Sequence, residues 1–153
     1  MKIRGGIWMV VGSVVAAGLV GALVAARSHG DDRGFSNRTI KGVWGFNTSF
    51  GMLVLPAPAQ PVPTTGMGRI HFDGDGNCQV STVANINGDS LRLESSSCTY
   101  TVNPDGTGTS EAFFPGAPVP GALPVAFVIV DRGQELRFMN TRFIVGTFTA
   151  NRQ

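Results

Sequence analysis

Short runs of β-branched and aromatic residues recur from Ile40 to the end of the chain, separated by Gly, Asn, Asp and Pro. The runs follow one another at intervals of roughly ten residues, a spacing typical of an all-β sandwich or barrel. No convincing helical periodicity occurs after Ile40. A length of 153 residues allows one such domain, or at most a small pair.

The pattern predicts about eight strands, most of them joined by short hairpins, so that neighbours run antiparallel. The Pro-rich segment 56–63 is expected to lie outside the sheet, because proline cannot donate a ladder hydrogen bond. Eight antiparallel strands in up-and-down order can close into a single barrel, which either encloses one small ligand or is filled by side chains. The expected strands are residues 41–55, 67–72, 78–86, 90–102 (with the serines 95–97 as a point of interruption), 107–114, 125–130, 135–139 and 143–149.

The first 26 residues have the pattern of a secretory signal peptide. Lys2 and Arg4 precede an uncharged, largely apolar stretch, residues 7–26, that ends in small residues. The alternative is an uncleaved membrane anchor helix, because about twenty apolar residues can span a bilayer. Either reading places the rest of the chain outside the cytoplasm, secreted or periplasmic in the first case and membrane-anchored in the second. Residues 27–39 are polar and predict a flexible leader, and residues 40–153 form the predicted barrel domain.

The balance of charge does not point to an anionic partner. The chain has 12 Lys and Arg against 10 Asp and Glu, and Lys2 and Arg4 belong to the expected signal. Without that signal, ten basic residues face ten acidic ones, so the net charge is near zero. We therefore expect no nucleic-acid partner, and contact with a membrane only through residues 7–26 if they are retained.

Cys78 and Cys98 are the only cysteines in the sequence. If residues 87–89 form a three-residue hairpin loop, Ile86 pairs with Ser90, and equal steps outward place Cys78 opposite Cys98. Directly opposed residues of an antiparallel pair bring their β-carbons close to the separation that a disulfide needs. The spacing predicts a disulfide. Two buried free thiols are the alternative, and a single pair lacks the spacing of a zinc site.

Asp73, Asp75 and Asn77 alternate as at the start of a calcium-binding loop. The complete loop also requires Gly at its sixth position and Glu at its twelfth, where this sequence has Cys78 and Ala84. The segment is therefore interpreted as a tight turn between two strands, and no metal site is expected.

Arg69, His71 and Asp73 share one face of an expected strand, since alternate residues of a strand point to the same side. If that face lined a cavity, His71 could act as an acid or base; if it faced solvent, the three would be ordinary surface residues. The weak candidates for catalysis are His71, Glu111 and Tyr100. No Ser-His-Asp arrangement is supported, because one of the two histidines lies in the expected leader.

Aromatic residues supply much of the expected core, and a subset of them could line a ligand cavity. Tyr100 and Arg137 could be polar anchors in such a pocket, with a strand-surface position or a satisfied buried position as the alternative. The residues expected to bind a ligand are Trp44, Phe46, Arg69, His71, Tyr100, Phe127, Arg137 and Phe138.

The segment Gly42-Val43-Trp44 resembles the Gly-x-Trp signature on the first strand of lipocalins and related calycin barrels. Residues 68–77, 100–108 and 131–138 look like a recurrent pattern in small secreted bacterial proteins of uncharacterised function, and this likeness extends over most of the chain after the signal. Those proteins look like single eight-stranded barrels of the lipocalin or allene-oxide-cyclase-like type. The resemblance implies a fold and an exported location, and it brings no catalytic residues.

Export, predicted closure and a Phe-rich interior favour a non-enzymatic barrel that holds a small apolar molecule without a cofactor. The alternative is a cofactor-free isomerase or cyclase in the same type of barrel, with polar groups such as His71, Glu111 or Tyr100 in a shaped pocket. A third hypothesis is a structural domain at the cell surface whose barrel is filled by side chains.

Overall fold

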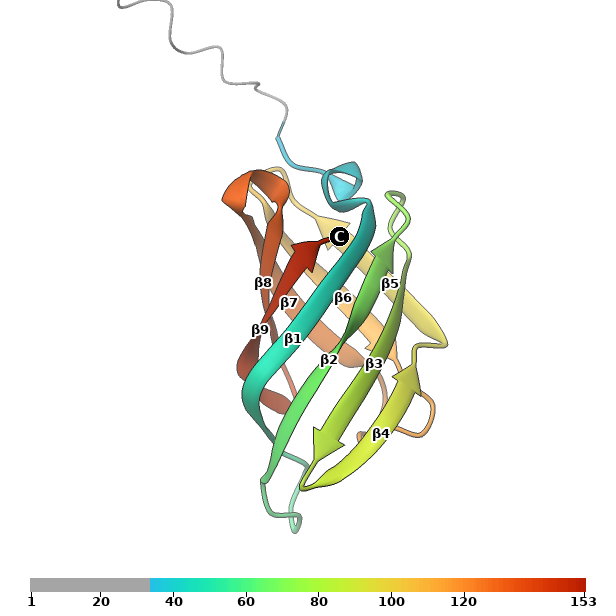
Figure 1. Cartoon of the computed structure of the whole chain (residues 1–153), viewed down its shortest axis with the longest axis vertical. Coiled ribbons are helices and arrows are strands. Elements are labelled where there is room, and N and C mark those ends of the chain that lie inside the picture. The colour runs from blue at the N-terminus through green and yellow to red at the C-terminus, as the bar shows by residue number, and fades with distance from the viewer. Residues whose placement is uncertain (1–33) are drawn as a thin grey trace, which may run out of the picture. The chain divides into compact units, whose positions relative to one another are not determined.

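The computed structural model describes residues 34–153, which form an all-β domain, as the strand pattern predicts (Figure 1). The expected signal or anchor at residues 1–26, and residues 27–33 of the expected leader, lie outside this range. Within it, no helix has the length and apolar character needed to cross a membrane. The elements are η1 (Asn37–Ile40), β1 (Gly42–Leu53), β2 (Val62–Phe72), β3 (Cys78–Ile86), β4 (Asp89–Glu94), β5 (Ser97–Val102), β6 (Thr107–Phe113), β7 (Leu123–Val130), η2 (Asp131–Gly133), β8 (Glu135–Asn140) and β9 (Ile144–Arg152).

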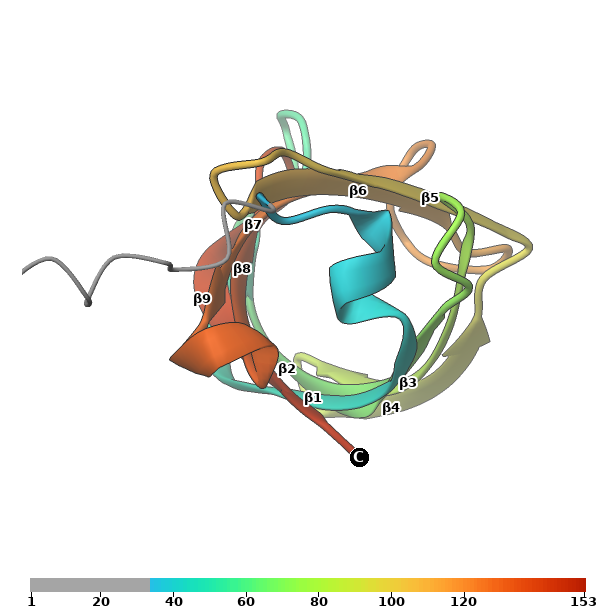
Figure 2. The ribbon, with the colours of Figure 1, turned by 90° about the horizontal axis from the view of Figure 1, so that it is seen from above.

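The strands form one antiparallel sheet that curls into a barrel. Hydrogen-bonded neighbours follow the order β4-β3-β2-β1-β9-β8-β7-β6-β5, and Figure 2 shows the strands arranged as a ring. The ring closes at β3, whose residues 81–86 pair with β4, while the preceding Asn77 forms a bridge with Thr99 of β5. The Tyr100 N–H also donates to the Gly76 carbonyl at 2.9 Å.

The expected strand at residues 90–102 is interrupted at the serines, as the sequence indicates, and forms two strands, β4 and β5. Its expected register with β3 is wrong by one residue, since Ile86 pairs with Asp89 and not with Ser90. The reason is the turn: Asn87 and Gly88 alone connect the strands, with φ of 53° and 98°. Positive φ at both central residues is typical of the two-residue hairpin turn that Asn-Gly favours.

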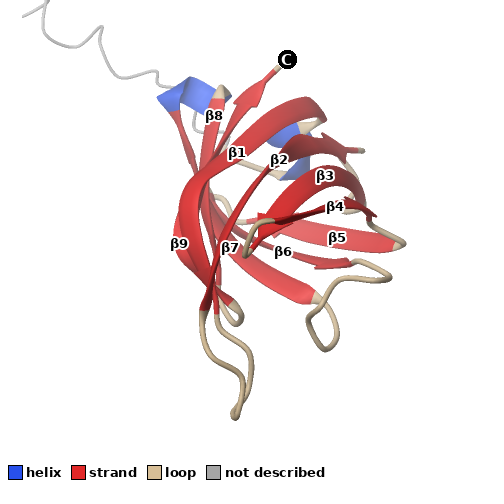
Figure 3. Cartoon of the chain, turned by 60° about the horizontal axis from the view of Figure 1, so that its bottom comes forward, coloured by secondary structure: helices blue, strands red, loops and turns tan. Residues whose placement is uncertain are grey.

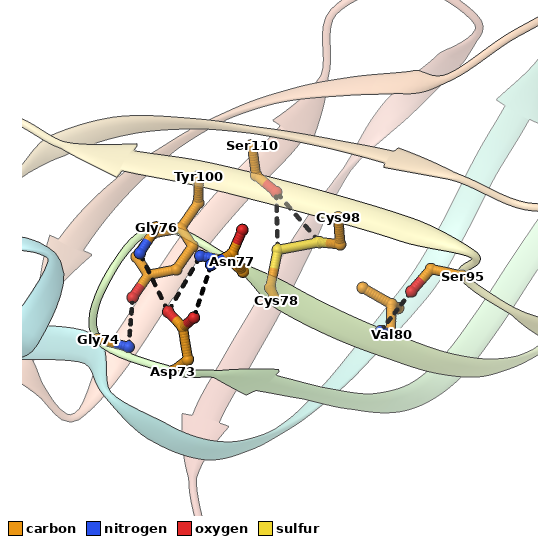
Figure 4. Close-up of a disulfide and its surroundings, with 10 residues drawn as sticks. All are labelled: Asp73, Gly74, Gly76, Asn77, Cys78, Val80, Ser95, Cys98, Tyr100 and Ser110. Atoms are coloured by element: carbon orange, nitrogen blue, oxygen red, sulfur yellow. Dashed lines mark hydrogen bonds between the residues drawn. A yellow bond between two sulfur atoms is a disulfide. The ribbon is translucent and has the colours of Figure 1, made fainter.

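The serine-rich link between β4 and β5 compensates for that shift. Residues 77–81, at the start of β3, lie opposite residues 94–99, which run from the end of β4 into β5. The β4–β5 segment is one residue longer and therefore forms a β-bulge. The bulge places Cys78 opposite Cys98, with their Cα atoms 4.8 Å apart, and the predicted disulfide is confirmed (Figure 4). A disulfide indicates an oxidising, non-cytoplasmic location, because cytosolic thiols are kept reduced.

The expectation that all of segment 56–63 lies outside the sheet is wrong at its end. β2 begins at Val62, and Pro63 pairs with Met52 of β1. Pro63 lies beyond the residues of β2 that pair with β3, and its carbonyl accepts a hydrogen bond from the Asn87 N–H at 2.9 Å. A residue without an N–H is tolerated at such a strand end.

The short helix η1 lies across one end of the barrel, here called the η1 end (Figure 2). Packed side chains fill the barrel at this end. Ile40 and Trp44 are fully buried, and the indole N–H of Trp44 donates to the Ile40 carbonyl at 2.7 Å. The Arg152 guanidinium lies 4.9 Å from the centre of the Trp44 ring and donates to the carbonyls of Thr39 and Lys41. These contacts hold η1, which begins inside the segment expected to be a leader. The rest of this core consists of Phe72, Tyr100, Val102, Phe127, Ile129, Leu136 and Ala150.

The β2–β3 connection is a tight turn organised by the Asp73 carboxylate (Figure 4). Its oxygens accept hydrogen bonds from the side chain of Asn77 and from the backbone N–H groups of Asp75, Gly76 and Asn77, at 2.7 to 3.0 Å. These bonds, the one from the Asn77 side chain above all, lower the pKa of Asp73 from 3.8 to about 2. No cluster of metal-ligating side chains occurs among residues 34–153.

Replacement of both cysteines by alanine should lower the free energy of unfolding by about 3 kcal/mol, the loop-closure term for a cross-link of this span. Urea denaturation of the two proteins measures the difference. A reducing agent should bring the unmodified protein down to the stability of the double variant and leave the variant unchanged. Equal stability of both proteins without reductant would contradict the prediction.

Asp73→Asn should reduce the loss of folding stability at acid pH. The folded-state pKa of Asp73 is lowered, so its stabilising effect is present above pH 3.8 and is lost as the pH falls towards about 2. Thermal unfolding between pH 5 and pH 2 should therefore show a smaller decrease for the variant. Asp105, whose pKa is lowered chiefly by the Thr107 hydroxyl, contributes part of the decrease in stability with falling pH in both proteins. Asp89→Asn, at the exposed start of β4, is the matched control and should retain the full slope.

Candidate ligand cavity

A cavity of about 160 Å³ lies inside the barrel, between the η1-end core and the opposite end. Figure 3, with its loops in tan, shows the connections at this opposite end, which join β1 to β2, β3 to β4, β6 to β7 and β8 to β9. The lining begins at Phe72 and Leu136 and extends to residues 117–119 of the β6–β7 loop. The cavity is partly open to solvent.

Inward-pointing side chains of the strands make the cavity apolar. Because side chains alternate between the two faces of a strand, every second residue reaches the interior. The Phe138 and Phe148 rings stack with their centres 5.1 Å apart, and Phe46 lies edge-on to Phe138 at 6.1 Å. The aromatic residues of the lining are Phe46, Phe72, Phe114, Phe127, Phe138 and Phe148.

Most polar side chains of the lining already have hydrogen-bond partners in the protein. Thr64 Oγ1 donates to the Asn85 carbonyl at 3.1 Å, and Thr65 Oγ1 donates to the carbonyl of Thr48. The Asn140 amide donates to the Pro124 carbonyl at 2.9 Å, and its oxygen accepts three backbone N–H bonds from residues 142–144. Among the described residues, Thr48 Oγ1 is the buried side-chain oxygen that has no partner.

Phe46, Phe127 and Phe138 line the cavity, as expected from the sequence. Trp44 and Tyr100 are buried too, but they belong to the core at the η1 end and are not part of the lining. The Tyr100 hydroxyl accepts a hydrogen bond from the Gly74 N–H at 2.9 Å and donates to the Asn37 carbonyl at 3.2 Å. Burial raises the pKa of Tyr100. Its hydroxyl therefore holds η1 and the β2–β3 turn together and does not reach the cavity.

Arg69, His71 and Arg137 lie on the outer wall and do not line the cavity, which is the surface alternative that the sequence leaves open for each of them. On β2 the alternation sends Ile70 and Phe72 inward, which turns the residues between them towards solvent. Arg137 is 69% exposed and forms an ion pair with Glu135 at 2.7 Å. Of the three weak catalytic candidates, His71 and Glu111 are thus exposed and Tyr100 is in the core, so the structure does not bring them together.

The sequence expectation missed Thr48, Phe148 and the loop residues 117–119. Phe148 could have been found, because β9 repeats an inward alternation through Ile144 and Phe148. Thr48 could have been found as well, because it continues the inward alternation of Trp44 and Phe46 before the β-bulge between residues 48 and 51. The loop residues carry no sequence signal for a site.

Comparisons with protein-family models, with curated proteins and with solved structures give no match to this chain. The cavity geometry therefore carries the functional argument by itself.

Thr48→Val should leave the protein as stable as before or stabilise it by up to about 1 kcal/mol, because it replaces an unpartnered buried hydroxyl with a methyl group of the same shape. Thr64→Val is the matched control in the same lining. Its hydroxyl has a partner, so its loss should destabilise the protein by about 1 kcal/mol. Urea denaturation measures both changes. A destabilised Thr48→Val variant would show that this hydroxyl is satisfied.

Proposed function

We propose that this protein is an exported β-barrel that binds a small hydrophobic ligand in its interior cavity. The observation that carries the proposal is the combination of an open, apolar cavity of about 160 Å³ with a barrel whose other end is filled by core side chains. An apolar cavity of about 150 Å³ in another protein stays dry and takes up benzene. The size and lining here fit a ligand of about one ring.

The barrel type and the location are part of the same proposal. β4 and β5 both pair with the β3 side, which supports counting them as one bent strand. On that count we assign the protein to the eight-stranded barrels of the lipocalin or allene-oxide-cyclase-like type. The Gly42-Val43-Trp44 segment opens β1 and supports this assignment. The pattern of residues 1–26 and the disulfide support secretion or a periplasmic location.

The geometry favours binding over the two other hypotheses. A cofactor-free isomerase needs polar groups in the pocket, and His71 and Glu111 point away from it. A purely structural barrel needs a filled interior, and this interior holds a cavity.

Titration of the full chain with toluene tests the proposal. We expect saturable binding, seen as chemical-shift changes at cavity residues and as an unfolding temperature that rises with toluene concentration. Ala84→Phe places a ring in the cavity and should abolish both effects. Val83→Phe, one residue earlier on β3 and exposed, adds the same ring outside and should retain them.

The paired variants separate cavity binding from binding to other apolar parts of the chain. Toluene effects that survive Ala84→Phe would place the binding elsewhere and overturn the proposal. The absence of any saturable effect in the unmodified chain would overturn it as well.

A further inference from the structure

We infer that the cavity selects electrically neutral molecules of about one ring, with at most one or two polar groups, and rejects ionised molecules of the same size. The inference rests on the proposed function and specifies its ligand class. Three features of the structure carry it: the charge of the lining, the hydrogen bonds of the lining and the charge of the surrounding loops.

No charged residue lines the cavity in the part of the chain that the structure describes. The polar residues of the lining are threonines, Ser110 and Asn140, all of them uncharged. An ionised carboxylate or ammonium group that enters such a site loses its hydration and gains no counter-ion, which is strongly unfavourable. Neutral molecules do not incur this cost.

The hydrogen bonds of the lining limit the number of polar groups on the ligand. The Asn140 amide group and the hydroxyls of Thr64 and Thr65 already donate to backbone carbonyls. The Thr82 hydroxyl donates to the Met67 carbonyl at 3.0 Å. A ligand with many polar groups would therefore exchange hydrogen bonds with water for few bonds with the protein. Thr48, whose hydroxyl has no protein partner, is the side chain best able to accept one such group.

The loops at the opposite end place little charge near the opening. Residues 54–61 and 114–122 contain no charged side chain. Arg142, in the β8–β9 connection, is exposed and does not line the cavity, and its guanidinium lies 4.7 Å from the centre of the Phe143 ring. Asp89, exposed at the start of β4, would repel a carboxylate. The one cation of these connections is therefore outside the cavity lining.

Most charged residues of the connections lie at the η1 end instead. The β2–β3, β5–β6 and β7–β8 connections contain Asp73, Asp75, Asp105, Asp131 and Arg132. The filled core of the η1 end separates these charges from the cavity. Their fields act in solvent and contribute little inside the barrel.

Toluene, benzyl alcohol and benzoate test the inference, because they share one ring and differ in polarity and charge. Isothermal titration of the full chain at pH 7 should show binding of toluene and benzyl alcohol. The affinity for benzoate should be lower by a factor of about ten or more. Ala84→Phe should remove the binding of all three. Benzoate binding as tight as that of benzyl alcohol would overturn the inference and leave the proposed function intact.

A designed cation should weaken the selection against benzoate. Val119 lines the cavity from the β6–β7 loop, so Val119→Lys should raise the affinity for benzoate by about two- to fivefold, the effect of one partly exposed ion pair. Pro120→Lys adds the same charge at the exposed neighbouring position and should raise the affinity for benzoate less than Val119→Lys does. Equal effects of both variants would show that general charge, and not the cavity, governs selection. If none of the three compounds binds the unmodified chain, the proposed function fails and the inference fails with it.

Discussion

The structure depends on the closure of the sheet at β3. This strand has β4 along its second half and β5 beside its beginning, so one strand joins the two ends of the sheet. The Cys78–Cys98 disulfide lies where the pairing changes from one partner to the other, and isolated backbone hydrogen bonds and the bond from the Val80 N–H to the Ser95 hydroxyl assist it there. Without this closure the inward side chains would face solvent, and the cavity would have no opposite wall.

The position of the cavity follows from the sizes of the inward side chains. At the η1 end, Trp44, Phe72 and Tyr100 pack edge to face and leave no room. Towards the other end the inward positions include Thr48, Gly66, Ala84 and Ala112, which cannot fill a barrel of this width. The same sheet therefore gives a packed core at one end and a cavity at the other.

Much of the fold could be predicted from the sequence, because strand pattern and turn residues act locally. The disulfide was predicted from a register that is wrong by one residue, and it forms because the bulge at residues 95–97 cancels the error. Which face of a strand points inward could not be predicted, since alternation defines two faces without saying which is buried. On β2 the face with Arg69 and His71 lies outside, and the polar site candidates there were lost with it.

This arrangement has a consequence for chemistry. The titratable side chains of the described strands lie on the outer wall or at the ends, and none of them lines the cavity. Tyr100, the one titratable group among the core side chains, is fixed by two hydrogen bonds at the η1 end, and burial raises its pKa. Under the proposed function, such an interior would act on a ligand through shape and the exclusion of water. Shape selects ligands by size, and the exclusion of water selects against charged ligands. Comparing neutral and charged ligands of the same size is therefore the direct test of this cavity.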